Sequence, residues 1–415
     1  MPSKLSLLAA VGLCIGLTAA PLSAQKEDEV LTKGATGNDP YTEGKPELKE
    51  ALGIASYGPF LFCEHGNDKV QQEMGDLDIL WIETEHFRIG SNLPEYKIPN
   101  GDKIQKNKLR AELKELNEVL PGFKYKRIKV IDKWLRLHLY AQRVEKIWDD
   151  VSEILGVDDS AFPAGRGELV NGAYAGEGPY FGHAEKHCIL LLQKESNLGR
   201  FTQRFINLNR STPIRWQFTK TDTIFFGTCT EFGEGYFRND SILHNHVVFN
   251  VAHNLVDAFK HHTWSLPVWI PEGIAHHLCR KQDERYNNYS AVEEGSTSLR
   301  KEWDWAPKVR ARVKHEIAPP SETMANWMKY DDLKFTNHLM VWARVDYMLK
   351  EHPEKFASFV SKLKSGIPGV ESYQLPTADQ VRSQQKAVFM EMFGWTWEDF
   401  DEAWSKWILK NYPKK

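Results

Sequence analysis

Residues 267–277 read PVWIPEGIAHH, and this stretch decides how the rest of the chain is interpreted. Pro271 suits the first turn of a helix, where its missing N–H group leaves no hydrogen bond unmade. Glu272 and His276 are four residues apart, so a helix places both side chains on one face. The pattern predicts a helix from Glu272 to Arg280 with a carboxylate and an imidazole side by side.

A second pair of the same kind lies upstream. Residues 242–262 predict a long helix, within which residues 253–257 read HNLVD. His253 and Asp257 are again four residues apart and share a face. Two helices that each offer such a pair can hold one zinc ion, because zinc accepts imidazole nitrogen and carboxylate oxygen. For His276 a partly exposed position on the helix is the favoured interpretation, and a fourth ligand or a hydrogen-bond partner of His253 are alternatives.

The run from Pro267 to Ala275 resembles the P-x-W-l-x-E-G-l-A motif of the peptidase MA-like, gluzincin-type zinc metallopeptidase superfamily. The resemblance is to secreted bacterial members of that superfamily whose function is unknown. That superfamily carries an HExxH motif on the preceding helix. The resemblance spans roughly residues 77–412, with strong motif identity at 267–275. It implies a zincin-like fold and a metal site formed by His253, Asp257 and Glu272, with zinc as the cofactor.

The chain departs from this family pattern because HNLVD stands in place of HExxH. Asn254 occupies the position of the glutamate that takes the proton from metal-bound water. An amide cannot act as a general base, and losing that base costs a factor of roughly 10² to 10⁴ in rate. Asp257 replaces the second histidine, which makes the ligand set harder and less selective for zinc. His276 is the candidate for a substitute base.

We therefore expect an exported metallopeptidase-like protein with a degenerate active site, which serves as a non-peptidase binding or structural homologue. The alternative is a metal-dependent hydrolase or peptidase that uses His253, Asp257 and Glu272 with His276 as a replacement base. Whether the chain is an enzyme therefore stays open at this point. The expected partner is a peptide or protein ligand.

The amino-acid composition and the N-terminal sequence restrict the partners and the location of the protein. The 415 residues include 53 Lys and Arg against 56 Asp and Glu, which gives a formal net charge of −3. This near-neutral balance argues against nucleic acid as a partner, which requires a basic face. Lys4, the apolar stretch 5–20 and the small residues before Gln25 predict a signal peptide cleaved after Ala24. We expect a secreted or periplasmic protein, with no membrane span after signal cleavage because the apolar stretch is too short.

The pattern predicts an α+β protein in four parts. Residues 1–24 form the signal peptide and residues 25–76 a partly ordered leader. Residues 77–283 form a zincin-like α+β domain with a mixed sheet and two central helices, and residues 284–415 an all-helical C-terminal part. The family resemblance implies an edge strand that binds peptide by strand addition, and we place it at 233–237.

Two further features remain open in the sequence. Cys63, Cys188, Cys229 and Cys279 are either buried free thiols or, in an oxidising compartment, disulfide-bonded. Cys188 and Cys229 are the favoured pair, since both end strand-like runs. A remote alternative function is a carbohydrate-binding or glycoside-acting protein. It rests on an exposed platform of Trp303, Trp305 and Trp327 and on the carboxylates of Glu231 and Glu234.

Overall fold

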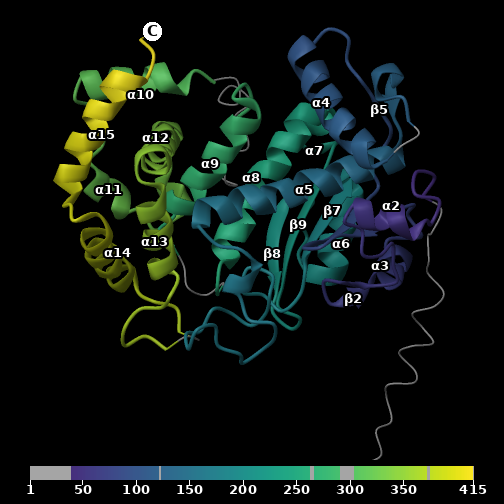
Figure 1. Cartoon of the computed structure of the whole chain (residues 1–415), viewed down its shortest axis with the longest axis horizontal. Helices are drawn as coiled ribbons and strands as arrows, with labels where there is room; N and C mark the ends of the chain where they lie inside the picture. The colour runs from purple at the N-terminus through teal and green to yellow at the C-terminus, as the bar shows by residue number, and fades with distance from the viewer. Residues whose placement is uncertain (1–38, 121–122, 262–265, 290–302, 372–373, 415) are drawn as a thin grey trace, which may run out of the picture.

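The structure is a computed structural model that describes residues 39–120, 123–261, 266–289, 303–371 and 374–414. The predicted signal peptide and its cleavage site lie outside the described residues. Among the residues described, no helix is both long and apolar enough to cross a membrane. The described chain is a mixed α+β fold with a five-stranded mixed sheet and a largely helical C-terminal part, which confirms the predicted fold class at this level (Figure 1).

The main sheet has the strand order β3-β4-β7-β9-β8. β4, β7 and β9 run parallel, whereas β3 and β8 are antiparallel to their neighbours. All side chains of β7 are buried, as expected for a central strand covered on both faces. The strand bounds are β3 Leu80–Glu83, β4 Phe87–Ser91, β7 His187–Leu192, β8 Ile214–Phe218 and β9 Thr223–Cys229.

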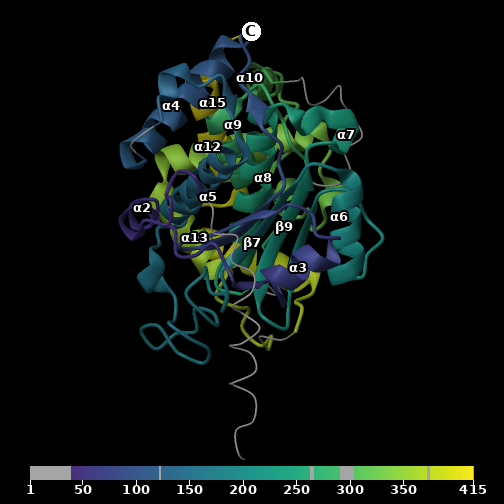
Figure 2. The same cartoon turned by 90° about the vertical axis from the view of Figure 1, so that its right-hand side faces the viewer.

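Helices cover both faces of the sheet. α5 (Lys133–Leu155) and α8 (Asp240–Ala258) pack on the face that presents Ile189 and Leu191. α6 (Glu195–Phe201) and the π-helical turn η3 (Thr202–Ile206) pack on the face that presents Leu190 and Leu192. Figure 2 shows α5 and α6 on opposite sides of the sheet. The alternation of side chains along β7 therefore divides one apolar run between two cores.

The described part of the predicted leader is packed against this sheet. Phe62 and Val70 belong to the same buried cluster as Trp81 and Leu190. Besides β3 and β4, the elements before α5 are α2 Pro46–Ala51, β1 Leu61–Phe62, β2 His65–Gly66, α3 Asn67–Glu73, β5 Tyr96–Lys97, α4 Lys103–Val119, η1 Tyr125–Arg127 and β6 Val130–Ile131. The short turn η2 (Asp159–Ala161) follows α5. Residues 46–76 thus contribute to the fold itself.

The C-terminal part is helical, as predicted. Its elements are α10 Trp305–Lys314, α11 Ser321–Ala325, η6 Tyr330–Asp332, α12 Phe335–Glu351, α13 Pro353–Leu363, α14 Ala378–Phe393 and α15 Trp397–Asn411. One hydrophobic cluster runs from the sheet through these helices to Tyr412, so the two predicted parts share a core. Trp305 is buried in that cluster. The exposed tryptophan platform that the remote carbohydrate-binding alternative requires therefore does not form.

The predicted edge strand at 233–237 is wrong. This segment forms the short helix α7 (Phe232–Gly235) and the turn η4 (Tyr236–Arg238). Gly233, Glu234 and Gly235 have φ angles of 62°, 61° and 80°, and three successive left-handed residues cannot extend a strand. The antiparallel strand at the edge beside β9 is β8, which the sequence analysis did not identify.

The favoured disulfide between Cys188 and Cys229 is also wrong. All four described cysteines are buried free thiols. On the parallel strands β7 and β9, Cys188 lies opposite Phe225, whereas Cys229 lies opposite Leu192. The two cysteines are thus four strand residues apart, or roughly 13 Å. A disulfide requires Cα atoms within about 7 Å of one another.

Cys63 and Cys188 are instead the pair expected to cross-link under oxidation. The backbone N–H of Cys63 donates to Cys188 Sγ at 3.2 Å. Burial raises the pKa of the Cys63 thiol, and the neighbouring Cys188 raises it further. Because the thiolate is the reactive form, we expect slow formation of this disulfide with excess oxidised glutathione, which is reduced to two thiols. Mass spectrometry should find a loss of two hydrogen atoms, absent from Cys63→Ser and retained in Cys279→Ser. A Cys188–Cys229 peptide would contradict the expectation.

Candidate functional site

The two central helices begin and end differently from the prediction. α8 ends at Ala258, and α9 (Trp269–Asp283) begins three residues before Glu272. Lys364 donates to the carbonyl oxygens of Asp257 and His261 at 2.7 Å and 2.6 Å. The buried Lys364 side chain thereby satisfies one carbonyl in the last turn of α8 and one just beyond it, and burial lowers the pKa of this lysine to about 7. α8 and α9 pack along one another beside the sheet (Figure 1).

His253 lies between two carboxylates. Its Nδ1 atom is 2.9 Å from Asp257 Oδ2, and its Nε2 atom is 3.3 Å from Glu272 Oε2. His253 and Glu272 are buried, whereas the Asp257 side chain is 30% exposed. The three side chains that the sequence analysis singled out form a chain of contacts in the order Asp257, His253, Glu272.

This chain does not match the zinc site that the family resemblance implies. Ligand atoms about 2.0 Å from a tetrahedral zinc ion are about 3.3 Å apart, and His253 Nε2 and Glu272 Oε2 have this spacing. Asp257, however, contacts Nδ1 on the other side of the ring. Among described residues, the trio is not a group whose ligand atoms all lie within 4.8 Å of one another. Asp257 is placed to orient the His253 ring and not to share an ion with it.

Asn254, at the position where the resembling family has its general-base glutamate, has a structural contact. Its Nδ2 atom donates to the carbonyl oxygen of Phe225 at 3.1 Å. This hydrogen bond joins α8 to β9. A carboxylate could not donate such a bond, so the local structure favours asparagine over glutamate at this position.

The second oxygen of Glu272 faces two more histidines. Glu272 Oε1 is 3.4 Å from His276 Nε2 and 3.1 Å from His338 Nδ1, and these two nitrogens are 3.0 Å apart. The exposed fractions of Glu272, His276 and His338 are 0%, 1% and 2%. Burial alone would raise the pKa of Glu272, but its contacts with His253, His276 and His338 hold it well below the usual value.

His276 is therefore neither an exposed histidine nor part of the open cleft. Burial lowers its pKa to about 4, although Glu272 acts in the opposite direction. An imidazole with this pKa is a weak base at neutral pH. The structure does not place it where the predicted substitute base would act.

Sequence reasoning missed His338, which lies on α12, 62 residues beyond His276. The close contact between α9 and α12 brings it to Glu272. A Cβ atom at Gly273 would lie 2.5 Å from Val345 Cγ2 and 3.2 Å from the Val341 carbonyl oxygen. Gly273 thus permits this approach, which explains a glycine inside a helix. Gly273 in the motif was the only sign in the sequence of a close helix contact, and it does not identify α12 as the partner helix.

A cleft of about 370 Å³ opens beside His253, between β8 and α8. Its lining residues are Arg215, Trp216, Gln217, Ile224, Asn254, Asp257 and Tyr330. Trp216 is 39% exposed. The Tyr330 ring lies 5.4 Å from the His253 ring, between that histidine and the Arg215 guanidinium group, which is 5.8 Å from the Tyr330 ring. Burial and the Asp257 carboxylate raise the pKa of Tyr330.

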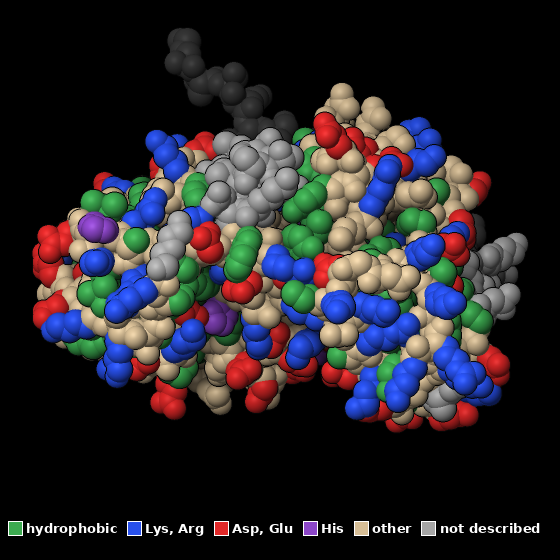
Figure 3. All heavy atoms as spheres, turned by 90° about the horizontal axis from the view of Figure 1, so that it is seen from above, with side chains coloured by type: hydrophobic (Ala, Val, Ile, Leu, Met, Phe, Trp, Pro, Cys, Tyr) green, Lys and Arg blue, Asp and Glu red, His purple; other side chains and the backbone are tan. Residues whose placement is uncertain are grey.

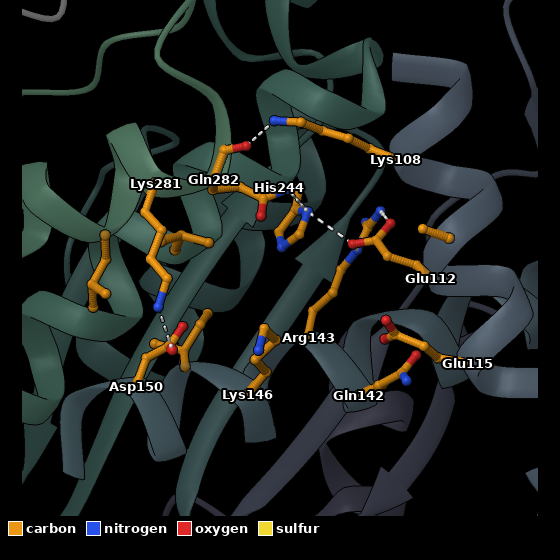
Figure 4. A pocket seen from close by; sticks show the side chains of 14 residues that line it. Lys108, Glu112, Glu115, Gln142, Arg143, Lys146, Asp150, His244, Lys281 and Gln282 are labelled. Atoms are coloured by element: carbon orange, nitrogen blue, oxygen red, sulfur yellow. Dashed lines mark hydrogen bonds and ion pairs between the residues drawn. The ribbon is translucent and has the colours of Figure 1, made fainter. Parts of the chain in front are cut away.

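A second pocket, of about 300 Å³, lies between α4, α5, α8 and α9 (Figure 4). In this pocket Lys281 pairs with Asp150 at 3.0 Å, and His244, whose pKa is held well below its usual value by burial, contacts Glu112 at 3.4 Å. His244 is nine residues before His253, or about 13.5 Å along α8. His244 and His253 thus belong to different environments.

No protein-family model matches the chain, and a search of curated proteins gives no match. By the geometry of its fold and site, the protein is a mixed α+β protein with a buried imidazole–carboxylate network beside a cleft at a sheet edge. Charged side chains of both signs are interspersed on the face in Figure 3.

Proposed function

We propose that the chain is a metallopeptidase-like peptide-binding protein that holds an extended peptide in the cleft between β8 and α8 without cleaving it. The observation that carries this proposal is the hydrogen bond from Asn254 to the carbonyl oxygen of Phe225. Asn254 stands where the resembling family has its general base, and here its side chain joins α8 to β9 instead. The orientation of Asp257 toward Nδ1 of His253 supports the same conclusion. The strand order and the paired helices α8 and α9 support a zincin-like arrangement.

The cleft suits an extended peptide because β8 forms the edge of the sheet. An edge strand presents backbone N–H and C=O groups to which a peptide can add as a further strand. β8 has five residues, so it matches a peptide segment of about 17 Å. Trp216 offers an exposed aromatic surface, and Arg215 and Asp257 offer one charge of each sign.

Peptide retention provides the test. A random-sequence decapeptide mixture is passed over the immobilised full chain, and the eluted peptides are identified by mass spectrometry. We expect the wild-type protein to retain intact peptides. Trp216→Ala should weaken retention by about tenfold or more, because truncating a central aromatic residue at an interface costs about 1.4 kcal/mol or more. Trp303→Ala is the matched control, since Trp303 is also exposed but lies outside the cleft lining.

Equal retention by the wild type and Trp216→Ala would contradict the cleft assignment. Cleaved peptides that appear with the wild type but not with His253→Ala would support the alternative function, a metal-dependent hydrolase. The observation in favour of that alternative is the 3.3 Å spacing of His253 Nε2 and Glu272 Oε2, which suits two ligands of one zinc ion. Its weaker points are the position of Asp257 and the burial of His276.

A further inference from the structure

Glu272 Oε1, His276 Nε2 and His338 Nδ1 form a triangle with sides of 3.4 Å, 3.1 Å and 3.0 Å. Among the described residues, these three side chains are one of the groups whose ligand atoms all lie within 4.8 Å of one another. α9 supplies Glu272 and His276, one helical turn apart, and α12 supplies His338. All three are almost completely buried.

Hydrogen bonds cannot form along all three sides of this triangle at the same time. A proton on one imidazole nitrogen lies along a single side, toward either the carboxylate or the other imidazole. If both facing nitrogens carried protons, the two N–H groups would oppose each other across the 3.0 Å side. A cation at the centre contacts all three lone pairs at once. Tetrahedral ligands about 2.0 Å from zinc are about 3.3 Å apart, close to the observed sides.

We propose that Glu272, His276 and His338 bind a divalent cation of the zinc class, which joins α9 to α12. Two imidazole nitrogens and one carboxylate oxygen favour zinc over magnesium or calcium, which prefer oxygen ligands. This site differs from the ligand set implied by the family resemblance, because His253 contacts the other carboxylate oxygen and Asp257 lies beyond it. The ion stabilises the helix contact at Gly273 and does not reach the peptide cleft.

Metal content and thermal stability test this site on the full chain. The protein is stripped with a chelator, reloaded with zinc, desalted and analysed for metal. We expect one equivalent of zinc in the wild type and a higher melting temperature than in the stripped protein. Loss of even an outer partner of a metal ligand lowers affinity by roughly 10- to 100-fold, so His338→Gln should lower zinc affinity by at least about 100-fold. His277→Gln, which alters a neighbouring histidine that contacts Asp346, should retain zinc.

Two results would overturn the proposal. One is no zinc in the reloaded wild type; the other is equal zinc affinity in the wild type and His338→Gln. Zinc lost from His253→Gln but kept by His338→Gln would place the ion on the other carboxylate oxygen. If His338→Gln does not fold, X-ray absorption of the zinc-loaded wild type decides the question, with two imidazole ligands expected and one or none contradicting the site. Peptide retention is measured separately, so failure of the metal site leaves the proposed peptide binding to its own test.

Discussion

Trp269→Ala is expected to lower the free energy of unfolding by about 3–5 kcal/mol, the usual cost of removing a large buried aromatic side chain. Trp269 is completely buried in the main hydrophobic cluster. Its ring stacks near Phe359 of α13, and its Nε1 atom donates to Gln385 of α14 at 2.6 Å. The variant leaves a cavity and also deprives the buried Gln385 oxygen of its donor.

Urea denaturation followed by circular dichroism measures this effect without relying on the fluorescence of the removed residue. Trp303→Ala is the control, because that side chain is 48% exposed and its loss should change the free energy by no more than about 0.5 kcal/mol. Similar midpoints for the two variants would show that the first turn of α9 does not depend on its contact with α13 and α14.

Asp240→Ala is the second substitution with a large expected effect, about 3–5 kcal/mol, because it leaves buried charges without their partner. Asp240 begins α8 and is 1% exposed. Its carboxylate contacts Arg136 at 3.1 Å and Arg143 at 2.9 Å, both from α5, and accepts a hydrogen bond from Tyr140. The helix that carries His253 is thus fixed to α5 by a buried ionic cluster.

Asp78→Ala is the matched control, since it breaks an exposed ion pair with Lys133 and should cost no more than about 1 kcal/mol. Burial alone would raise the pKa of Asp240, but Arg143 and Arg136 hold it well below its usual value. The stabilisation is therefore complete above the unfolded pKa of about 3.9 and is lost as the pH falls toward the lower folded pKa. The stability difference between wild type and Asp240→Asn should shrink below about pH 4. A constant difference down to pH 2 would contradict the ionic cluster.

Much of the secondary structure was predictable because its signals are local. The continuous apolar run at β7 is typical of a central strand, and the three- and four-residue spacing of apolar side chains in α5 and α12 is typical of amphipathic helices. β8 was missed because only Ile214 and Phe218 of its five side chains are buried, so its apolar pattern is too short to recognise. The segment at 233–237 was misread because its glycines adopt left-handed conformations that no periodicity reveals.

The candidate site was predictable only in part. His253, Asp257, Glu272 and His276 lie in the predicted helices and do meet in one network. Which atoms face one another was not predictable, because an i, i+4 spacing places two side chains on a face without fixing the rotation of the imidazole ring. That rotation decides that Asp257 contacts Nδ1 and Glu272 contacts Nε2.

The sequence by itself determined the α+β class, the two central helices and the asparagine at position 254, where the resembling family has a glutamate. These properties depend on neighbouring residues along the chain. The tertiary structure decided that β8 forms the sheet edge, that Cys63 lies beside Cys188, and that His338 joins Glu272 and His276. Such contacts join segments far apart in sequence, and they follow from how whole helices and strands pack, which no local pattern encodes.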